Sequence, residues 1–440
     1  MQRSEMMVLL TGLTLLSALS ATEAQTSTAL TYSVPARTGD LVFEDGNYDD
    51  DADKELLLAN RFVSLIIEPE LGGVIAGFCY HGVEFTQRQA TNMPGGGGGI
   101  LNDLIRQQGW SGDWTQKPYG YTLLENGPER IRLKLSRAGK TGPYAFVTIN
   151  KIINLWRDRS TVEVEYEVAV DTKATMPLPV GMYVNNFVGT RNGDAKNRDV
   201  VYFFPTERGI RTVRWSTDQP NYNDGGSRFF DVSRGWIGFA DQTRKTGLAA
   251  AVDVKYVRDW YTWPSNRHNG LATFEWRFFD VRIPHGSSYK TSCYLTPFKG
   301  FDKITGAGTH TVGALAFADR KLVAQVIAGK AQDANARLRY RRLPAEDWTV
   351  LIDKPVSFEV DTPASLVAEV NADTPGTYVF SLVLTHDGTE LLDMQKPYVV
   401  GSPSGAYTLA RKEPRFMRDE KKIETSWKSM AVETPHVKWA

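Results

Sequence analysis

The chain has 440 residues, and its 51 Lys and Arg side chains balance 51 Asp and Glu side chains, so the formal net charge is zero. It is 42% hydrophobic and 11% aromatic and contains two cysteines. The balanced charge argues against a nucleic-acid binder, the apolar content against a disordered chain, and the cysteine count against a disulfide-rich scaffold. The length suits about two to three domains.

The first 24 residues predict a secretory signal peptide. Arg3 precedes a short apolar run at 6–18, and small residues lead to a cleavage point after Ala24. The run is shorter than the roughly 20 residues of a membrane span, and no later stretch is long and apolar enough to span. We therefore expect a secreted or periplasmic protein with no membrane span after cleavage. An uncleaved anchor is the alternative.

Short β-rich runs follow one another from about residue 57 to residue 295, separated by Gly, Asn, Asp and Pro. The segment TVEVEYEVAV (161–170) alternates apolar and acidic residues, which is the two-residue period of a half-buried strand. Only 101–109 reads as helical. Many strands with turns between them predict an all-β, antiparallel first domain, which we place at 25–300.

A second group of closely spaced strands occupies 301–402. About 100 residues with this spacing suit a small immunoglobulin-like β-sandwich, although the Cys–Trp–Cys core of true immunoglobulin domains is missing. The last segment, 403–440, is polar and densely charged, and a solvated tail is the expected form.

Three segments carry a resemblance to a known family. In 60–85 one strand precedes the turn Pro69-Glu70-Leu71-Gly72-Gly73 and a second strand follows it. A Pro-x-Gly turn and a long strand occupy 283–300, and 136–169 reads as paired central strands. Over roughly residues 40–300 the chain resembles galactose mutarotase-like proteins. That resemblance implies a large β-supersandwich, shared by sugar epimerases, polysaccharide lyase domains and non-catalytic sugar binders.

The chain departs from mutarotases where those enzymes carry their catalytic histidine. The matching segment PVGMYVNNFVG (179–189) has Asn185 and Asn186 there. Asparagine exchanges no proton near neutral pH, so we do not expect mutarotase activity and keep both residues as substrate-binding candidates. The resemblance implies that Glu275 stands where the family has its general base.

Two further clusters suggest a sugar site. In 109–121, Asp113 is flanked by aromatic rings, and in 256–270, Tyr261 and His268 lie among tryptophans and arginines. Aromatic platforms beside carboxylates and amides suit saccharides, while plain loop packing is the alternative. The candidates are catalytic His268, Glu275, Tyr261 and Asp113, and substrate-binding Trp110, Trp114, Tyr119, Tyr121, Asn185, Asn186, Trp260, Trp263 and Arg267.

The sequence thus predicts an exported carbohydrate-binding or carbohydrate-processing protein whose partner is a saccharide and not a nucleic acid. A hydrolase would use two carboxylates from Asp113, Asp259 and Glu275, and a lyase would use Tyr261 or His268 with Arg267. A non-catalytic saccharide-binding or structural envelope protein is the alternative. The six histidines form no metal-ligand set, and no cofactor is expected. A disulfide between Cys79 and Cys293 and two buried thiols both remain open.

Overall fold

The computed structural model describes residues 41–48, 53–87, 98–110, 112–190, 199–214, 226–263 and 272–401, and the backbone of 433–434 and 437–438. Within this part of the chain the helices are three short 3-10 segments, η1 (Arg106–Gln108), η2 (Gly142–Phe146) and η3 (Val254–Tyr256). The all-β prediction is confirmed. Residues 1–24, predicted as a signal peptide, lie outside the described residues, as do all but four residues of 403–440.

A nine-stranded antiparallel sheet, in the order β14-β13-β16-β17-β21-β10-β9-β8-β7, forms the body of the first sandwich. In β10 the valines and Tyr166 are buried, while the alternating glutamates point to the other face. Its strands are β7 (Gly120–Asn126), β8 (Arg130–Ala138), β9 (Val147–Trp156), β10 (Val162–Val170), β13 (Val200–Thr206), β14 (Gly209–Arg214), β16 (Trp236–Asp241), β17 (Thr246–Val252) and β21 (Ser288–Lys299).

Two five-stranded sheets and one strand pair complete the first sandwich. The first sheet consists of β1 (Val42–Gly46), β2 (Glu55–Ala59), β3 (Val63–Glu68), β4 (Val74–Tyr80) and β5 (Val83–Glu84). The second has, in spatial order, β15 (Ser227–Phe229), β18 (Val257–Thr262), β19 (Thr273–Phe278), β12 (Met182–Phe187) and β6 (Asn102–Ile105). The pair is β11 (Leu178–Val180) with β20 (Val281–Ile283).

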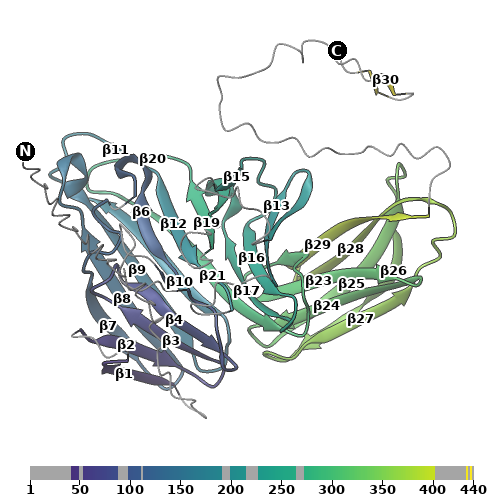
Figure 1. Cartoon of the computed structure of the whole chain (residues 1–440), viewed down its shortest axis with the longest axis horizontal. Coiled ribbons are helices and arrows are strands. Elements are labelled where there is room, and N and C mark those ends of the chain that lie inside the picture. Colours follow the sequence, from purple (N-terminus) through teal and green to yellow (C-terminus); the bar gives the residue numbers. More distant parts are fainter. Residues whose placement is uncertain are drawn as a thin grey trace, which may run out of the picture.

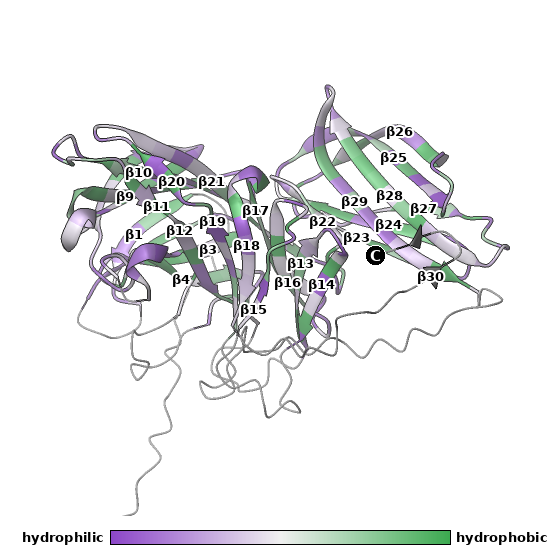
Figure 2. Cartoon of the chain, turned by 90° about the horizontal axis from the view of Figure 1, so that it is seen from above, coloured by the Kyte–Doolittle hydropathy of each residue, from purple (hydrophilic) through white to green (hydrophobic). Residues whose placement is uncertain are grey.

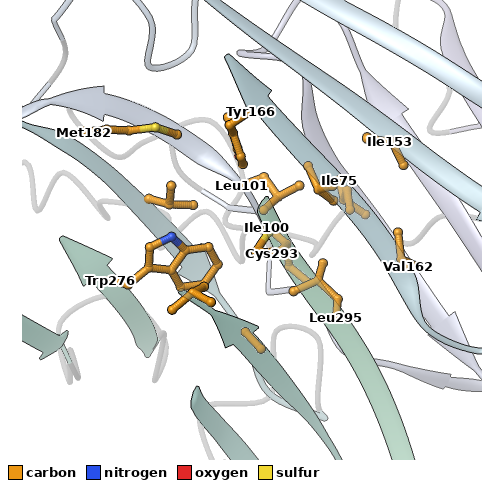
Figure 3. Close-up of a cluster of buried hydrophobic side chains, with 14 of the residues drawn as sticks. Ile75, Ile100, Leu101, Ile153, Val162, Tyr166, Met182, Trp276, Cys293 and Leu295 are labelled. Carbon is orange, nitrogen blue, oxygen red and sulfur yellow. The ribbon is translucent and has the colours of Figure 1, made fainter. Parts of the chain in front are cut away.

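One apolar core joins these sheets. Figure 3 shows Ile153 and Val162 of the nine-stranded sheet in the same cluster as Met182 and Trp276 of the second five-stranded sheet. The helix expected at 101–109 is wrong for the first half, which is strand β6, fully buried and paired with β12, and only Arg106–Gln108 is helical, as the 3-10 segment η1. A helix this short forms too few hydrogen bonds to offset the free-energy cost of helix nucleation, so strand pairing in the core decides the conformation of this segment.

Two four-stranded sheets form the second sandwich, and Figure 1 shows it beside the first. Figure 2 shows polar and apolar residues alternating along its strands. Its immunoglobulin-like character stays a prediction. The strands are β22 (Gly306–Ala307), β23 (Thr311–Ala318), β24 (Lys321–Ala328) and β27 (Ala364–Glu369) in one sheet, and β25 (Gln332–Arg342), β26 (Thr349–Phe358), β28 (Gly376–His386) and β29 (Thr389–Val400) in the other, followed by the separate pair β30 (Glu433–Thr434) and β31 (Val437–Lys438).

An apolar cluster joins the two sandwiches. Trp236 and Phe298 of the first pack with Val312 and Ile327 of the second. Both cysteines are free thiols, with Cys293 buried in the first core. In the described residues no helix is long and apolar enough to cross a membrane.

Candidate functional site

The face of the sheet β15-β18-β19-β12-β6 that points away from the apolar core is polar and largely buried, and strand register brings its side chains together. Asn185 lies opposite Glu275, and Glu275 lies opposite Tyr261 on the next strand. The alternate residues, such as Trp260 and Trp276, are buried in the core. We call the polar surface the Glu275 face, and it comprises Tyr183, Asn185, Arg228, Asp259, Tyr261, Thr273, Glu275 and Arg277.

Glu275 is the centre of this face and is fully buried. Its Oε1 accepts hydrogen bonds from Asn185 Nδ2 at 2.8 Å and from the Thr273 hydroxyl, and its Oε2 accepts one from the Tyr183 hydroxyl. Burial raises the pKa of Glu275 well above its usual value, and the positive charge of Arg277 opposes this only in part. Glu275 therefore holds its proton at pH values where an exposed glutamate has lost it.

A second carboxylate lies one strand away. Asp259 is fully buried and accepts a hydrogen bond from Arg277 Nε at 2.6 Å. Burial raises the pKa of Asp259, while the charge and hydrogen bond of Arg277 oppose the shift. The guanidinium of Arg277 also lies 5.1 Å from the ring centroid of Tyr261 and 5.7 Å from that of Tyr183. Register also places Arg228 of β15 opposite Tyr261, with its guanidinium 5.5 Å from the ring centroid. The face thus combines two carboxyl groups, two guanidinium groups and two aromatic rings.

Two acceptor atoms on this face accept no hydrogen bond from the described residues, although one of them, Asp259 Oδ2, lies 3.7 Å from Arg258 Nε. Asn185 Oδ1 and Asp259 Oδ2 are shielded from water and have no hydrogen-bond partner among the described residues. Buried polar atoms are almost always paired, so two orphans on one face need an explanation. Hydroxyl donors of a ligand would satisfy both, provided that the groups covering the atoms move aside.

Tryptophans flank the Glu275 face at one end. Trp110 is 43% exposed, and its ring centroid lies 6.4 Å from that of Phe187, two residues beyond Asn185 on β12. The half-buried Trp263 donates its backbone N–H to Thr273 Oγ1 at 2.9 Å. The structure therefore brings Trp110 and Trp263 toward Asn185, Tyr261 and Glu275, as a sugar site requires.

Three aromatic candidates are buried in the core, so the prediction that they form platforms for a saccharide is wrong. Trp114 is fully buried, and its Nε1 donates to the Arg137 carbonyl at 3.1 Å. Trp260 is fully buried and donates to the Pro205 carbonyl at 3.2 Å. Tyr119 is 2% exposed and donates to Asp103. Packing on both ring faces prevents any of them from stacking on a sugar.

Asp113 has a structural environment. Its Oδ2 accepts from Gln108 Nε2, from the backbone N–H groups of Lys140 and Thr141, and from the Thr141 hydroxyl. Burial alone would raise the pKa of Asp113, but these hydrogen bonds outweigh it and lower the pKa to about 2. An anion so fully satisfied holds loops together and is a poor proton donor at neutral pH.

The remaining candidates are dispersed. Asn186 faces the interior, where it accepts from the Leu101 N–H and donates to the Phe274 carbonyl. Tyr121 is 48% exposed on β7, the edge strand of the nine-stranded sheet. His268 and Arg267 lie outside the described residues. Among the described residues no group of three or more His, Cys, Asp or Glu side chains could hold a metal ion.

Tyr183, Thr273 and Arg277 were missed as site residues by sequence reasoning, although a signal existed. In β12 and β19 a polar residue recurs at every second position, at Tyr183 and Asn185 and at Glu275 and Arg277, and the alternate positions are apolar except for Asn186. A two-residue period of polar groups inside buried strands indicates one shared polar face.

Comparisons with family models and with curated proteins found no match. Similar solved structures include a TPR-domain containing protein from Parabacteroides distasonis, at 13% identity and a TM-score of 0.42, with 56% of this chain and 47% of that chain covered. A galactose mutarotase related enzyme from Lactobacillus acidophilus has 9% identity, a TM-score of 0.41, and coverage of 57% and 99%. A galactose mutarotase-like protein from Lactobacillus casei has 8% identity, a TM-score of 0.42, and coverage of 55% and 99%.

Mutarotase-like proteins are thus among the structural neighbours of this chain, as the sequence resemblance predicted. The chain spans about half the length of the Parabacteroides protein. Because the identities and TM-scores are low, function has to be argued from the residues of this chain.

Proposed function

We propose that this protein binds and processes a poly- or oligosaccharide at the Glu275 face. The observation that carries the proposal is the pair of orphaned acceptors, Asn185 Oδ1 and Asp259 Oδ2, on a face flanked by Trp110 and Trp263. Sugars supply both hydroxyl donors for such acceptors and apolar C–H faces for the rings. Because the acceptors are shielded, binding requires a local rearrangement and is slower than a diffusion-limited encounter.

The chemistry best supported at this face is hydrolysis. A glycoside hydrolase uses one protonated and one ionised carboxyl group, whose environments push their pKa values apart. Burial raises the pKa of both carboxyl groups, and that of Glu275 well above its usual value, whereas at Asp259 the ion pair and hydrogen bond of Arg277 oppose the shift. Glu275 is therefore the group that keeps its proton to the higher pH, and Asp259 is the group that ionises first. A lyase would need a neutral-pH base, and burial raises the pKa of Tyr261. Mutarotation is not proposed, because asparagines replace the family's histidine.

A glycan array followed by product analysis of each retained glycan tests both parts of this proposal. We expect Asn185→Ala to weaken retention of the glycan by about tenfold or more. The substitution removes an acceptor for the glycan and also removes the amide that holds the Glu275 side chain in place. Glu275→Gln should retain the glycan and lower the rate of product formation by about 100-fold or more. Tyr121→Ala, on the other sheet, is the matched control and should change neither.

The alternative is a non-catalytic saccharide binder, and one observation favours it. Glu275 is fully buried and already accepts three hydrogen bonds, an arrangement that also suits a purely structural carboxyl group. Retention without products in the wild-type protein would establish this alternative. A wild-type protein that retains no glycan at all would overturn the saccharide proposal itself.

We also propose that the protein is exported, on the strength of the apolar run at 6–18 and the small residues before position 25. N-terminal sequencing of the protein recovered outside the cytoplasm should begin at Gln25. A chain that stays cell-associated and begins at Met1 would contradict export by signal cleavage.

A further inference from the structure

The nine-stranded sheet has an outer face that the Glu275 face does not share. Along β10, the glutamates alternate with the buried valines and lie on this outer face. Strand register extends it into two rows of side chains across β8, β9, β10 and β21, which run side by side in Figure 1. One row is Lys134, Ile152, Glu165 and Ser292, and the other is Ser136, Asn150, Glu167 and Lys290.

The second sandwich covers only one half of this outer face. Trp236 and Phe298 are on the covered half and pack against β23 and β24. On the other half, η3 stands beside β21 and closes one side of a hollow of about 440 Å³. A hollow of this size falls within the range of small-molecule sites. It is lined by Lys134, Asn150, Ile152, Glu165, Tyr166, Glu167, Asp253, Lys255, Tyr256, Lys290, Thr291 and Ser292.

Two apolar surfaces in the hollow suit the C–H face of a sugar ring. Tyr256 is half-buried on η3, and its ring meets that of Tyr289 edge-on, with centroids 5.2 Å apart. That contact orients the Tyr256 ring before any ligand arrives. Lys255 Nζ lies over one face of the ring, 4.7 Å from its centroid, so a sugar ring would stack on the opposite face. Ile152, also half-buried, supplies an aliphatic surface between the two charged residues of its row.

Most charges in the hollow neutralise one another. Glu167 accepts from Ser288 and Asn150 and pairs with Lys290 at 3.4 Å, and its pKa is lowered because these contacts outweigh its burial. Asp253 pairs with Lys255 at 2.9 Å. The oxygen and nitrogen atoms of these groups that face the hollow remain available for hydrogen bonds with the hydroxyls of a ligand.

Lys134 differs from the other lysines of the hollow. Lys255 and Lys290 each have a carboxylate partner, whereas Lys134 has no ion pair or hydrogen bond to any residue that the structure describes. Its neighbour in the row is the aliphatic Ile152, not an acidic residue. The lining has three lysines and three carboxylates, but Glu165 pairs with Arg132, outside the lining, at 3.4 Å. The ammonium group of Lys134 is therefore left without a partner among the described residues, which favours a ligand with one negative charge.

We propose that this hollow binds an acidic saccharide, with a uronate carboxylate at Lys134, a sugar ring against Tyr256 and Ile152, and hydroxyls at Glu165, Asn150 and Ser292. This site lies on a different sheet from the Glu275 face and is formed by different residues. The proposal for the hollow can therefore be tested independently of the proposed function of the Glu275 face. It would hold an acidic polymer on the protein without any bond being broken.

Isothermal titration of the full chain with trigalacturonate, trimannuronate and a glucuronate trisaccharide, each with its methyl ester, tests the proposal. We expect at least one free acid to bind, and its ester to bind about tenfold more weakly because the charge is lost. Lys134→Gln should bind acid and ester equally. Tyr256→Ala should weaken both by about tenfold or more.

Lys134 and Tyr256 are half-buried and the control residue Lys117 is exposed, so folded variants are expected, and every variant is checked by its unfolding transition. Lys117→Gln, an exposed lysine outside the hollow, should bind as the wild type does. Asn185→Ala, which should weaken retention at the Glu275 face, should bind these acids as the wild type does, and this separates the two sites. The proposal is overturned if no acid binds, or if Lys134→Gln retains the preference for the free acid over its ester.

Discussion

Two tryptophans four residues apart have opposite environments in this protein. Trp110 is 43% exposed, whereas Trp114 is fully buried with its indole N–H bonded to the Arg137 carbonyl. Both come from the same aromatic segment and have similar neighbours in the chain. The difference arises because Trp114 meets strand β8, to which it is not adjacent in sequence. At the scale of single residues, exposure therefore depends on contacts that the local pattern does not contain.

The burial of Glu275 also depends on distant contacts, and it predicts that the stability of the folded protein changes with pH. Because burial raises its pKa in the folded state, the folded protein keeps a proton that the unfolded chain releases above about pH 4.3. The stability contributed by this group is fully present below the unfolded pKa and is lost as the pH rises through the folded pKa. We expect Glu275→Gln, which cannot titrate, to remove a slope of at most about 1.4 kcal/mol per pH unit.

Urea unfolding between about pH 4 and pH 8, followed by tryptophan fluorescence, measures this slope. Glu390→Gln, at an exposed position of β29, is the control and should leave the slope unchanged. If Glu275→Gln and the wild type lose stability in parallel as the pH rises, Glu275 does not hold a proton in the folded protein.

At the scale of whole strands, the apolar alternation of β9 is interrupted by a lysine on its buried side. Lys151 lies at a core-facing position between Ile149 and Ile153, and all three are fully buried. Its Nζ lies 2.8 Å from Asp103 Oδ2 on β6, so one ion pair joins two sheets. Tyr166 donates to the other oxygen of Asp103 at 2.9 Å. This buried network sets the position of β6, the edge strand of the sheet with the Glu275 face.

A double-mutant cycle tests that network. We expect Lys151→Met and Asp103→Asn each to lower the free energy of unfolding by about 3–5 kcal/mol, because each leaves an uncompensated group in the core. The double variant should lose clearly less than the sum, since it removes both charges. Chemical denaturation of the four proteins supplies the coupling energy. Strictly additive losses would mean that the two side chains do not interact.

At the scale of the whole molecule, a polar contact reinforces the apolar junction between the sandwiches. Asp361, 7% exposed in the second sandwich, accepts hydrogen bonds from the Tyr80 hydroxyl and His81 Nε2 and pairs with Lys299 at 3.2 Å. Burial, followed by the charge of Asp361, raises the pKa of Tyr80 above its usual range, so the hydroxyl stays a donor. Three groups of the first sandwich thus converge on one carboxylate of the second.

We expect Asp361→Asn to lower the free energy of unfolding by about 1–3 kcal/mol, because the charge that these donors share is removed. Asn tolerates the positive φ of 62° at this position, so the backbone is not strained by the change. Hydrogen exchange should accelerate around Tyr80 and His81. Asp387→Asn, at a positive φ of 47° in an exposed hairpin, is the matched control and should change stability by less than about 0.5 kcal/mol. Equal effects of the two substitutions would contradict an interdomain role for Asp361.

Part of the candidate site could be predicted from the sequence. Asn185, Tyr261 and Glu275 were predicted site residues, and register places them on neighbouring strands of one face. Trp260 was predicted with them, yet it is buried on the opposite face because it precedes Tyr261 by one residue. A shift of one position in a strand exchanges the two faces, and residue type alone does not reveal which face meets the core.

The amino-acid order was sufficient to determine that this chain is built from antiparallel strands, because the two-residue period is a property of neighbouring residues. It also shows asparagines where the resemblance to mutarotases would place a histidine, and this is why we do not expect mutarotase activity. Which polar groups meet was decided only by tertiary structure. Asn185 and Glu275 are 90 positions apart, and their contact, their burial and the raised pKa of Glu275 arise from strand pairing and from water excluded by distant segments.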